Sequence, residues 1–244
     1  INCNGLATTP QRIKDEYKGI LNKEEFELIE QIFNPYAWAK ANVKPTIFKE
    51  RWYQEQMSRC TARASVYRCG RRSGKSFSLA VKALFRMFNT EGTRVLMLAP
   101  AETQVKEFDG ILQNLIMGFK EEFTKSDNFL KERRKKPYYE QNYSNGSYFR
   151  GFIAANDAKT VRGQPADIII LDEVDYINQE ALVAIVAIML DNPNVELWVA
   201  STPSGKAELY KYEQNVTYKT WHFPSFVIPH YNDELDKEMR LQYG

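Results

Sequence analysis

Long apolar runs are missing from this chain of 244 residues, and no stretch approaches the roughly 20 apolar residues that a membrane-spanning helix needs. Cysteine is scarce: Cys3, Cys60 and Cys69 cannot all pair with one another, and their spacing is not that of metal ligands, which indicates a reducing compartment. The N-terminus lacks the apolar core of a signal peptide. Because the apolar fraction of 43% and the charged fraction of 26% are ordinary for a globular protein, the sequence excludes a membrane protein, a fibrous repeat and a largely disordered chain.

A strong net charge is absent as well, since 33 basic and 31 acidic residues leave a formal charge of +2. The whole molecule therefore has no field that would draw it to nucleic acid or acidic lipid. The two signs are nevertheless separated along the chain. Every charged residue from Gln56 to Thr90 is basic, and every charged residue from Gly163 to Gly205 is acidic. The first segment is suited to hold an anion and the second to hold a cation.

The pattern of apolar residues divides the chain into three segments. Residues 1–60 read as short helices that form a helical N-terminal lid, and residues 206–244 read as a C-terminal lid or linker. Between them, residues 61–205 alternate strands with helices, which predicts an α/β fold with a mostly parallel sheet and helices on both faces. The strands are expected at 65–69, 94–99, 138–143, 147–153, 167–171, 195–200 and 218–223, and the longer helices at 23–33, 49–58, 75–88, 102–119 and 179–190.

A glycine-bearing turn between the first expected strand and its helix is the strongest chemical signal. It reads Gly70-Arg71-Arg72-Ser73-Gly74-Lys75-Ser76. In a strand–turn–helix context, backbone N–H groups of such a loop wrap the β- and γ-phosphates of a nucleotide. Gly74 permits close approach, Lys75 neutralises phosphate charge and the Ser76 hydroxyl ligates Mg²⁺. Cys69 stands where the usual P-loop pattern has its first glycine, and Gly70 comes one position later.

Two carboxylates follow a continuous apolar strand, in the segment Ile168-Ile169-Ile170-Leu171-Asp172-Glu173. Ligands of parallel sheets bind at the carboxyl ends of the strands, so both side chains are expected beside the phosphates. Asp172 is the candidate for holding Mg²⁺, and Glu173 for orienting and deprotonating the attacking water. The alternative is a buried strand that ends in solvated acids, and the P-loop upstream argues against it.

Hydroxyl groups end the next expected strand, at Ser201-Thr202-Pro203. Ser201 and Thr202 are candidates for sensing the γ-phosphate and coupling its loss to movement. Taken alone, the segment equally fits a strand that ends in a proline turn.

Taken together, these segments resemble the N-terminal ATPase domain of a viral terminase large subunit, the motor that packages DNA into tailed-phage capsids. Arg71–Ser76 matches the family's modified Walker A pattern R-x-x-G-K-S/T, and Ile168–Glu173 matches its Walker B. Ser201–Pro203 resembles its coupling motif, and the Tyr53-Gln54 pair resembles the segment that recognises adenine. The resemblance covers roughly residues 45 to 230 and implies an ASCE, RecA-like P-loop core.

The resemblance also implies an activity and a set of partners. The cofactors are ATP and Mg²⁺, and hydrolysis drives double-stranded DNA into a procapsid through the portal protein, with the small terminase subunit. The implied assembly is a homo-oligomeric ring on the capsid, with a monomer in isolation. The implied location is the host cytoplasm and, transiently, the portal vertex of the procapsid, without a membrane. Nuclease activity is not expected, because the chain stops near Gly244 with no acidic cluster for two metals and, beginning at Ile, reads as an excised fragment.

Arginines are needed at such a site because charge spreads over the γ-phosphoryl oxygens during hydrolysis, and a guanidinium there accelerates the reaction by about 10³–10⁵. Arg71, inside the P-loop, is the candidate in cis, and Arg72 competes with it for that role. Arg162 lies eleven residues before Glu173 and is the candidate finger that reaches a neighbour's ATP. Alternatively, Arg162 is a solvated loop base.

Other features leave the function open. The run Lys131–Lys136 either contacts DNA phosphates or forms a solvated turn before a hairpin. Two further readings of the whole chain remain: the first motor domain of a DExD/H-type helicase, since Asp172–Asp175 fits that box, and a non-hydrolytic nucleotide-binding scaffold. The retention of both Asp172 and Glu173 argues against the scaffold.

Overall fold

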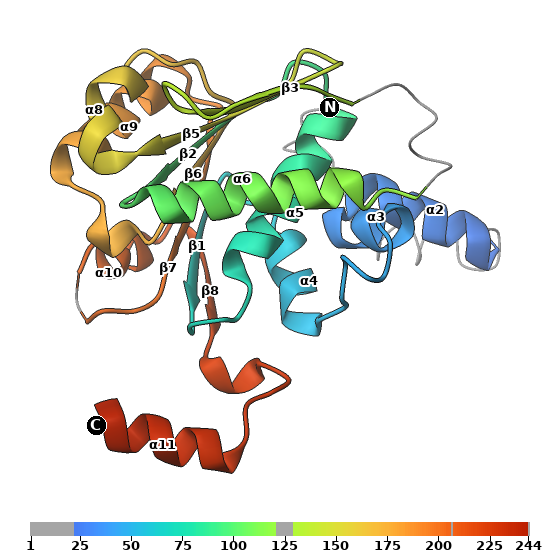
Figure 1. Cartoon of the computed structure of the whole chain (residues 1–244), viewed down its shortest axis with the longest axis vertical. Coiled ribbons are helices and arrows are strands. Elements are labelled where there is room, and N and C mark those ends of the chain that lie inside the picture. The colour runs from blue at the N-terminus through green and yellow to red at the C-terminus, as the bar shows by residue number, and fades with distance from the viewer. Residues whose placement is uncertain (1–21, 121–128, 206, 244) are drawn as a thin grey trace.

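The computed structural model describes residues 22–120, 129–205 and 207–243, and Cys3 and the first part of the expected lid lie outside this part of the chain. Its centre is an eight-stranded sheet with the order β3-β4-β5-β2-β6-β7-β1-β8 (Figure 1). All neighbours pair in parallel except β3 with β4 and β4 with β5. The strands are β1 (Ala64–Cys69), β2 (Arg94–Ala99), β3 (Leu130–Arg134), β4 (Tyr139–Tyr143), β5 (Tyr148–Ile153), β6 (Ile168–Asp172), β7 (Glu196–Ser201) and β8 (Lys219–Phe223). The mostly parallel sheet predicted from the sequence is confirmed.

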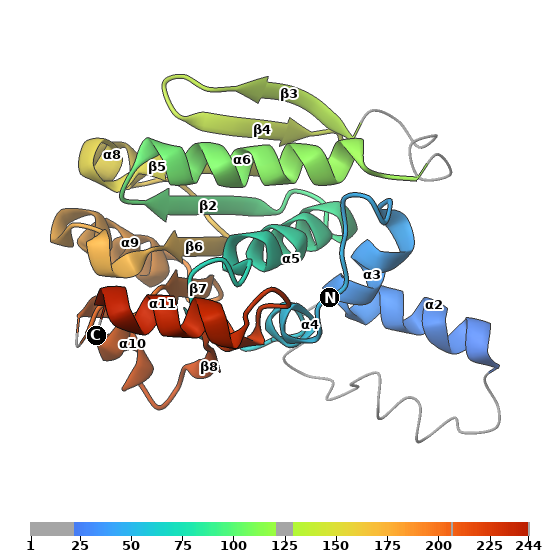
Figure 2. The ribbon, with the colours of Figure 1, turned by 60° about the horizontal axis from the view of Figure 1, so that its bottom comes forward.

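Helices cover both faces of this sheet (Figures 1 and 2). The α-helices are α2 (Lys23–Phe33), α3 (Pro35–Asn42), α4 (Trp52–Ser58), α5 (Lys75–Asn89), α6 (Glu102–Met117), α8 (Ala154–Val161), α9 (Gln179–Asp191), α10 (Glu208–Glu213) and α11 (Asp233–Tyr243). Two short 3₁₀ turns are η1 (Val174–Tyr176) and η2 (Ser225–Val227). None of these helices is both long and apolar enough to cross a bilayer.

Two apolar cores result from the alternation of side chains along the strands. On β6, Ile168 and Ile170 pack in the core under α3 to α6, whereas Ile169 and Leu171 pack in the core under α9. Every residue of β6 is buried, as a continuous apolar run between two helical layers requires. The buried face expected for the helix from Glu102 is also confirmed, since it consists of Val105, Phe108, Leu112 and Leu115.

The predicted hairpin is confirmed and extended by one strand. Strands β4 and β5 pair across Asn145-Gly146, and Gly146 adopts a positive φ of 79° that suits glycine. The turn expected for the basic run Lys131–Lys136 is wrong, because its first four residues belong to edge strand β3. Tertiary ion pairs hold them there: the Arg133 guanidinium lies 2.5 Å from the buried Asp109 carboxylate, and Arg134 pairs with the buried Glu140.

The segment from 206 to 244, expected as a lid or linker, contributes a strand to the central sheet. Strand β8 pairs with β1 from Ser65 to Cys69, where the P-loop begins. After β8 the chain forms η2 and then α11, which Figure 1 shows apart from the sheet and its covering helices.

Candidate active site

The loop from Gly70 to Ser76 joins β1 to α5 with two residues in the left-handed region. Arg72 has a φ of 60° and Gly74 a φ of 80°, and Gly74 directly precedes the first turn of α5. Left-handed residues in such a loop turn successive N–H groups toward one concave side, which suits an anion. The buried Ser73 hydroxyl has no hydrogen-bond partner, so the loop retains an unused donor. The loop therefore fits a phosphate group.

Helix α4 braces this loop through Gln54. The side-chain Nε2 of Gln54 donates a hydrogen bond to the carbonyl oxygen of Ser73 at 3.3 Å, and Gln54 is buried. A Cβ on Gly74 would lie 2.3 Å from that nitrogen, so a side chain at position 74 would clash with Gln54 in addition to straining the backbone. Gln54, predicted to recognise adenine, thus contacts the P-loop backbone in this structure.

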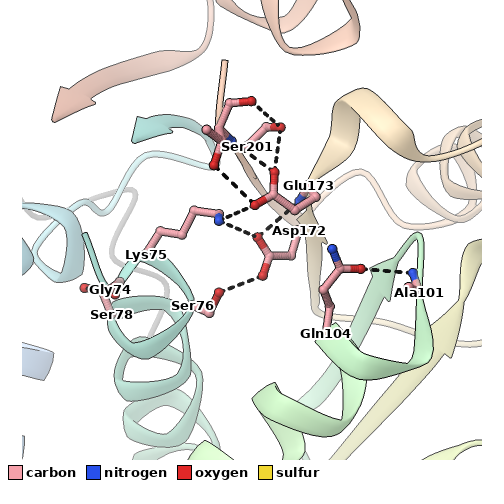
Figure 3. A network of polar contacts seen from close by, with 10 residues as sticks. Gly74, Lys75, Ser76, Ser78, Ala101, Gln104, Asp172, Glu173 and Ser201 are labelled. Atoms are coloured by element: carbon pink, nitrogen blue, oxygen red, sulfur yellow. Dashed lines mark hydrogen bonds and ion pairs between the residues drawn. The ribbon is translucent and has the colours of Figure 1, made fainter. Parts of the chain in front are cut away.

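Lys75 points from the start of α5 toward the two carboxylates at the end of β6 (Figure 3). Its Nζ lies 2.5 Å from Oε1 of Glu173 and 3.8 Å from Oδ1 of Asp172. One residue further along α5, the Ser76 hydroxyl donates to Oδ2 of Asp172 at 2.7 Å. The P-loop and the expected Walker B segment therefore form one site.

Strand β7 supplies a third wall. It lies between β1 and β6 in the sheet, so its carboxyl end emerges between the P-loop and Glu173. The Ser201 hydroxyl and the Thr202 backbone N–H each donate to Oε2 of Glu173 at 3.1 Å, and the Thr202 hydroxyl lies 3.4 Å from Oε1. Glu173 itself has a left-handed φ of 53°, a conformation that these contacts stabilise.

The two carboxyl groups differ in protonation. Burial raises the pKa of Asp172, and this effect outweighs the opposing influence of Lys75 and Ser76. Burial also favours a higher pKa for Glu173, but Lys75 and the hydrogen bonds from Thr202 and Ser201 outweigh it, so the pKa of Glu173 is lowered. Burial acts to lower the pKa of Lys75, and Asp172 and Glu173 together raise it. Glu173 and Lys75 are therefore an ion pair at neutral pH.

The oxygen atoms of Ser76 and Asp172 are the donors available for a divalent cation. Mg²⁺ prefers hard oxygen ligands and keeps several waters and substrate phosphates in its shell, so two protein ligands suffice. No group of three His, Cys, Asp or Glu side chains with metal-binding geometry occurs within residues 22–120, 129–205 and 207–243. The donor set fits a Mg²⁺ ion that a nucleotide brings with it rather than a site built of protein ligands alone.

A pocket of about 360 Å³ opens beside these groups. Its walls include the P-loop from Arg72 to Ser76, the carboxylates Asp172 and Glu173, and one face of α6. That face consists of Gln104, Glu107 and Ile111, which the sequence analysis does not single out. Their signal in the sequence is the 3.6-residue spacing at the start of the helix that follows β2, but only the sheet order places this helix opposite the P-loop.

The three candidate arginines occupy different places. Arg72 lines the pocket, whereas Arg71 is exposed and is not part of its wall. Arg162 is exposed after α8, on the connection that returns to the start of β6. The next residues, Gly163 to Ala166, line a separate cavity of about 310 Å³ together with Arg94, the first residue of β2. Arg162 is therefore not brought into the pocket of its own chain.

Gly70 has a structural neighbour that the sequence does not reveal. Its N–H donates to the carbonyl oxygen of Phe223 at 2.8 Å, and a Cβ on Gly70 would lie 2.5 Å from the backbone nitrogen of Ser225. The absence of a side chain at Gly70 thus accommodates the chain that leaves β8.

Residues 66–222 match the family profile described as terminase large subunit, T4likevirus-type, N-terminal. The chain belongs to this family. The match decides between the terminase and helicase interpretations of the P-loop and the Asp172-Glu173 pair. No curated protein sequence matches the chain.

Solved structures of phage terminases share the fold of this terminase domain. The large terminase ATPase domain of Thermus phage P74-26 superimposes with a TM-score of 0.62 at 22% identity, over 82% of this chain and 88% of that domain. The bacteriophage HK97 large terminase gives 0.62 at 13% identity, over 78% of this chain and 43% of that chain. A large terminase from a thermophilic bacteriophage in complex with ADP gives 0.53 at 14% identity, over 89% of this chain and 50% of that chain. The RecA-like ATPase fold expected from the sequence is confirmed.

Proposed function

We propose that this domain binds and hydrolyses ATP and that hydrolysis drives double-stranded DNA into a viral procapsid. The observation that carries the proposal is the pairing of two consecutive P-loop residues with two consecutive carboxylates, Lys75 with Glu173 and Ser76 with Asp172. A merely structural loop has no need for a buried acid pair opposite a lysine and a hydroxyl group.

Binding of a triphosphate changes the partner of Lys75. The Nζ of Lys75 now neutralises Glu173, and a phosphate oxygen with its higher charge competes for the same ammonium group. Release from Lys75 leaves Glu173 free to accept a proton from water, and Ser201 and Thr202 keep its carboxylate oriented through Oε2. The same two residues are the proposed coupling elements, because they connect Glu173 to the end of β7.

Ser76 and Asp172 would hold the metal. When bound, Mg²⁺ neutralises charge between the β- and γ-phosphate oxygens, which favours departure of the γ-phosphoryl group. In the present structure the Ser76 hydroxyl donates to Oδ2 of Asp172. Both oxygen atoms are thus close enough together to serve a single cation.

Arginine completes the site in this proposal. Arg72 already lines the pocket and Arg71 adjoins it in sequence, so either can reach the phosphates in cis when the loop closes. Arg162 is exposed outside the pocket, which suits a finger offered to a neighbouring subunit.

The wider role follows from the family. We propose double-stranded DNA, the portal protein, the procapsid and the small terminase subunit as partners, and a homo-oligomeric ring at the portal vertex in the host cytoplasm. The chain spans about half or less of the complete large terminases that it matches, so these partners concern the whole motor.

The test is phosphate release by this chain, measured with Mg²⁺ and with and without double-stranded DNA, together with packaging of DNA into procapsids by the complete subunit. The proposal expects Mg²⁺-dependent hydrolysis that DNA stimulates. Tight ATP binding without hydrolysis under all these conditions would contradict it and would restore the scaffold interpretation.

A further inference from the structure

Helix α6 presents a polar face to the pocket, and Gln104 is the first residue of that face. It is the third residue of the helix, and its Oε1 accepts a hydrogen bond from the backbone N–H of Ala101 at 2.9 Å. Glutamine and glutamate both serve at this position, since either oxygen satisfies an N–H group at the start of a helix.

The bond to Ala101 determines which end of the Gln104 amide faces the pocket. A backbone N–H can only donate, so the atom that meets it is the side-chain oxygen, and the NH₂ group must point the other way. Figure 3 shows this nitrogen directed from α6 toward the side of the pocket that holds Asp172 and Glu173. Within the part of the chain that the structure describes, the nitrogen donates to no protein acceptor.

We propose that the Gln104 amide donates a hydrogen bond to an oxygen of the γ-phosphoryl group and so distinguishes ATP from ADP. A group with two N–H donors and a tethered oxygen suits an anionic acceptor. The pocket that Gln104 lines also contains Lys75, the expected ligand of the same phosphate, on the opposite wall. The inference rests on the proposed ATP site and adds a residue that faces it from outside the P-loop and the strand ends.

The tether also gives the contact a mechanical consequence. A γ-phosphoryl oxygen bound to Nε2 is connected through the amide and the Ala101 N–H to the junction of β2 and α6. Loss of the γ-phosphate removes the force on that junction but leaves the bond to Ala101 intact. The α6 end of the pocket is thereby sensitive to hydrolysis.

The decisive variant is Gln104→Glu, which keeps an oxygen for Ala101 and replaces the donor with an acceptor. Gln104→Met is the neutral companion that removes the donor without adding charge. Thr103→Glu is the matched control, since Thr103 is exposed, adjacent and outside the pocket wall, so it adds the same charge without facing the phosphates.

The measurement is the affinity of the full chain for Mg²⁺-ADP and for a non-hydrolysable ATP analogue with a β–γ imido bridge, alongside thermal unfolding and phosphate release. We expect both Gln104 variants to bind ADP as wild type does and to bind the analogue about 10-fold more weakly or worse, with hydrolysis reduced by about 10²-fold. Thr103→Glu should retain the wild-type ratio of the two affinities, and Gln104→Glu should retain the wild-type Tm.

Two results would overturn the inference. A Gln104→Glu protein that keeps the wild-type affinity ratio and turnover, when wild type hydrolyses ATP, assigns Gln104 to helix capping alone and leaves the proposed function intact. A wild-type protein that binds neither nucleotide refutes the ATP site itself and the role of Gln104 with it.

Discussion

The Nζ atom of Lys75 lies 2.5 Å from Oε1 of Glu173, so the cation expected to bind phosphate and the expected general base neutralise each other in this structure. The two residues come from different elements, the start of α5 and the end of β6. The pair holds both groups ionised in a largely buried site. Nucleotide binding must break it, which links occupancy of the pocket to release of the base.

Lys75→Ala should remove most binding of Mg²⁺-ATP, because the triphosphate loses its main counter-charge in the pocket. The variant also leaves Asp172 and Glu173 without their shared cation, so the pKa of Glu173 should rise from its lowered value. Isothermal titration with ATP checks the first effect. Unchanged affinity for Mg²⁺-ATP would refute the P-loop assignment.

Glu173→Gln should bind Mg²⁺-ATP nearly normally and hydrolyse it at least ~10²-fold more slowly, because the amide cannot accept a proton. The amide oxygen can still accept the bonds from Ser201 and Thr202, so the site should keep its shape. Asp172→Ala should instead weaken the dependence on Mg²⁺. Turnover is measured by phosphate release under saturating ATP, and a normal rate for Glu173→Gln would leave the base unassigned.

Gly70→Ala should lower the free energy of unfolding by about 1–3 kcal/mol, because its Cβ would lie within 2.7 Å of backbone atoms of Ser225. Gly110→Ala is the matched control. A Cβ at Gly110, inside α6, meets nothing within 4 Å and should add about 0.5–1 kcal/mol. Urea unfolding compares the two. Equal effects of the same sign would show that the segment after β8 does not pack on the P-loop.

Lys82→Met should stabilise the protein at pH 7 by about 1–3 kcal/mol, since Lys82 is buried between α5 and the sheet. Its ammonium lies 4.0 Å from the Trp198 ring centroid and 3.4 Å from the Tyr67 hydroxyl, and no carboxylate among the described residues forms an ion pair with it. Burial lowers the pKa of Lys82 to about 8 from its ordinary 10.5.

The sign of the pH dependence follows from that shift. Between about pH 8 and 10.5 the unfolded chain holds the proton that the folded chain has released, so wild-type stability should rise with pH across this window. Urea unfolding at pH 7 and pH 10 should show this rise in wild type and in Lys106→Met, an exposed control on α6, but not in Lys82→Met. The same slope in all three proteins would contradict the prediction.

A mixture of Arg162→Ala and Glu173→Gln should recover part of the ATPase rate under conditions where the wild type assembles. Each variant alone is expected to be inactive, but a mixed interface can pair an intact Glu173 with a neighbour's intact Arg162. Size-exclusion chromatography with light scattering confirms co-assembly. No recovery in co-assembled mixtures would make Arg162 a loop base or a cis element.

Much of the fold could be predicted from local patterns. The apolar run of β6 and the Asn145-Gly146 turn each specify a local conformation through residues a few positions apart. Helix α8 and strand β3 could not be predicted in this way. Helix α8 has only eight residues and little apolar periodicity, and β3 is a charged strand that depends on Asp109 and Glu140, far from it in the sequence.

The sequence by itself determined which groups are available at the site, because the P-loop and the Asp172-Glu173 pair are contiguous motifs whose chemistry follows from residue type. Only the tertiary structure decided how they meet. The order β1-β7-β6 places Ser201 against Glu173 and brings Lys75 to both carboxylates, and α6 brings Gln104 to the same pocket. Strand order arises from long-range pairing and packing, so side chains that a motif leaves separate are joined only when the whole sheet forms.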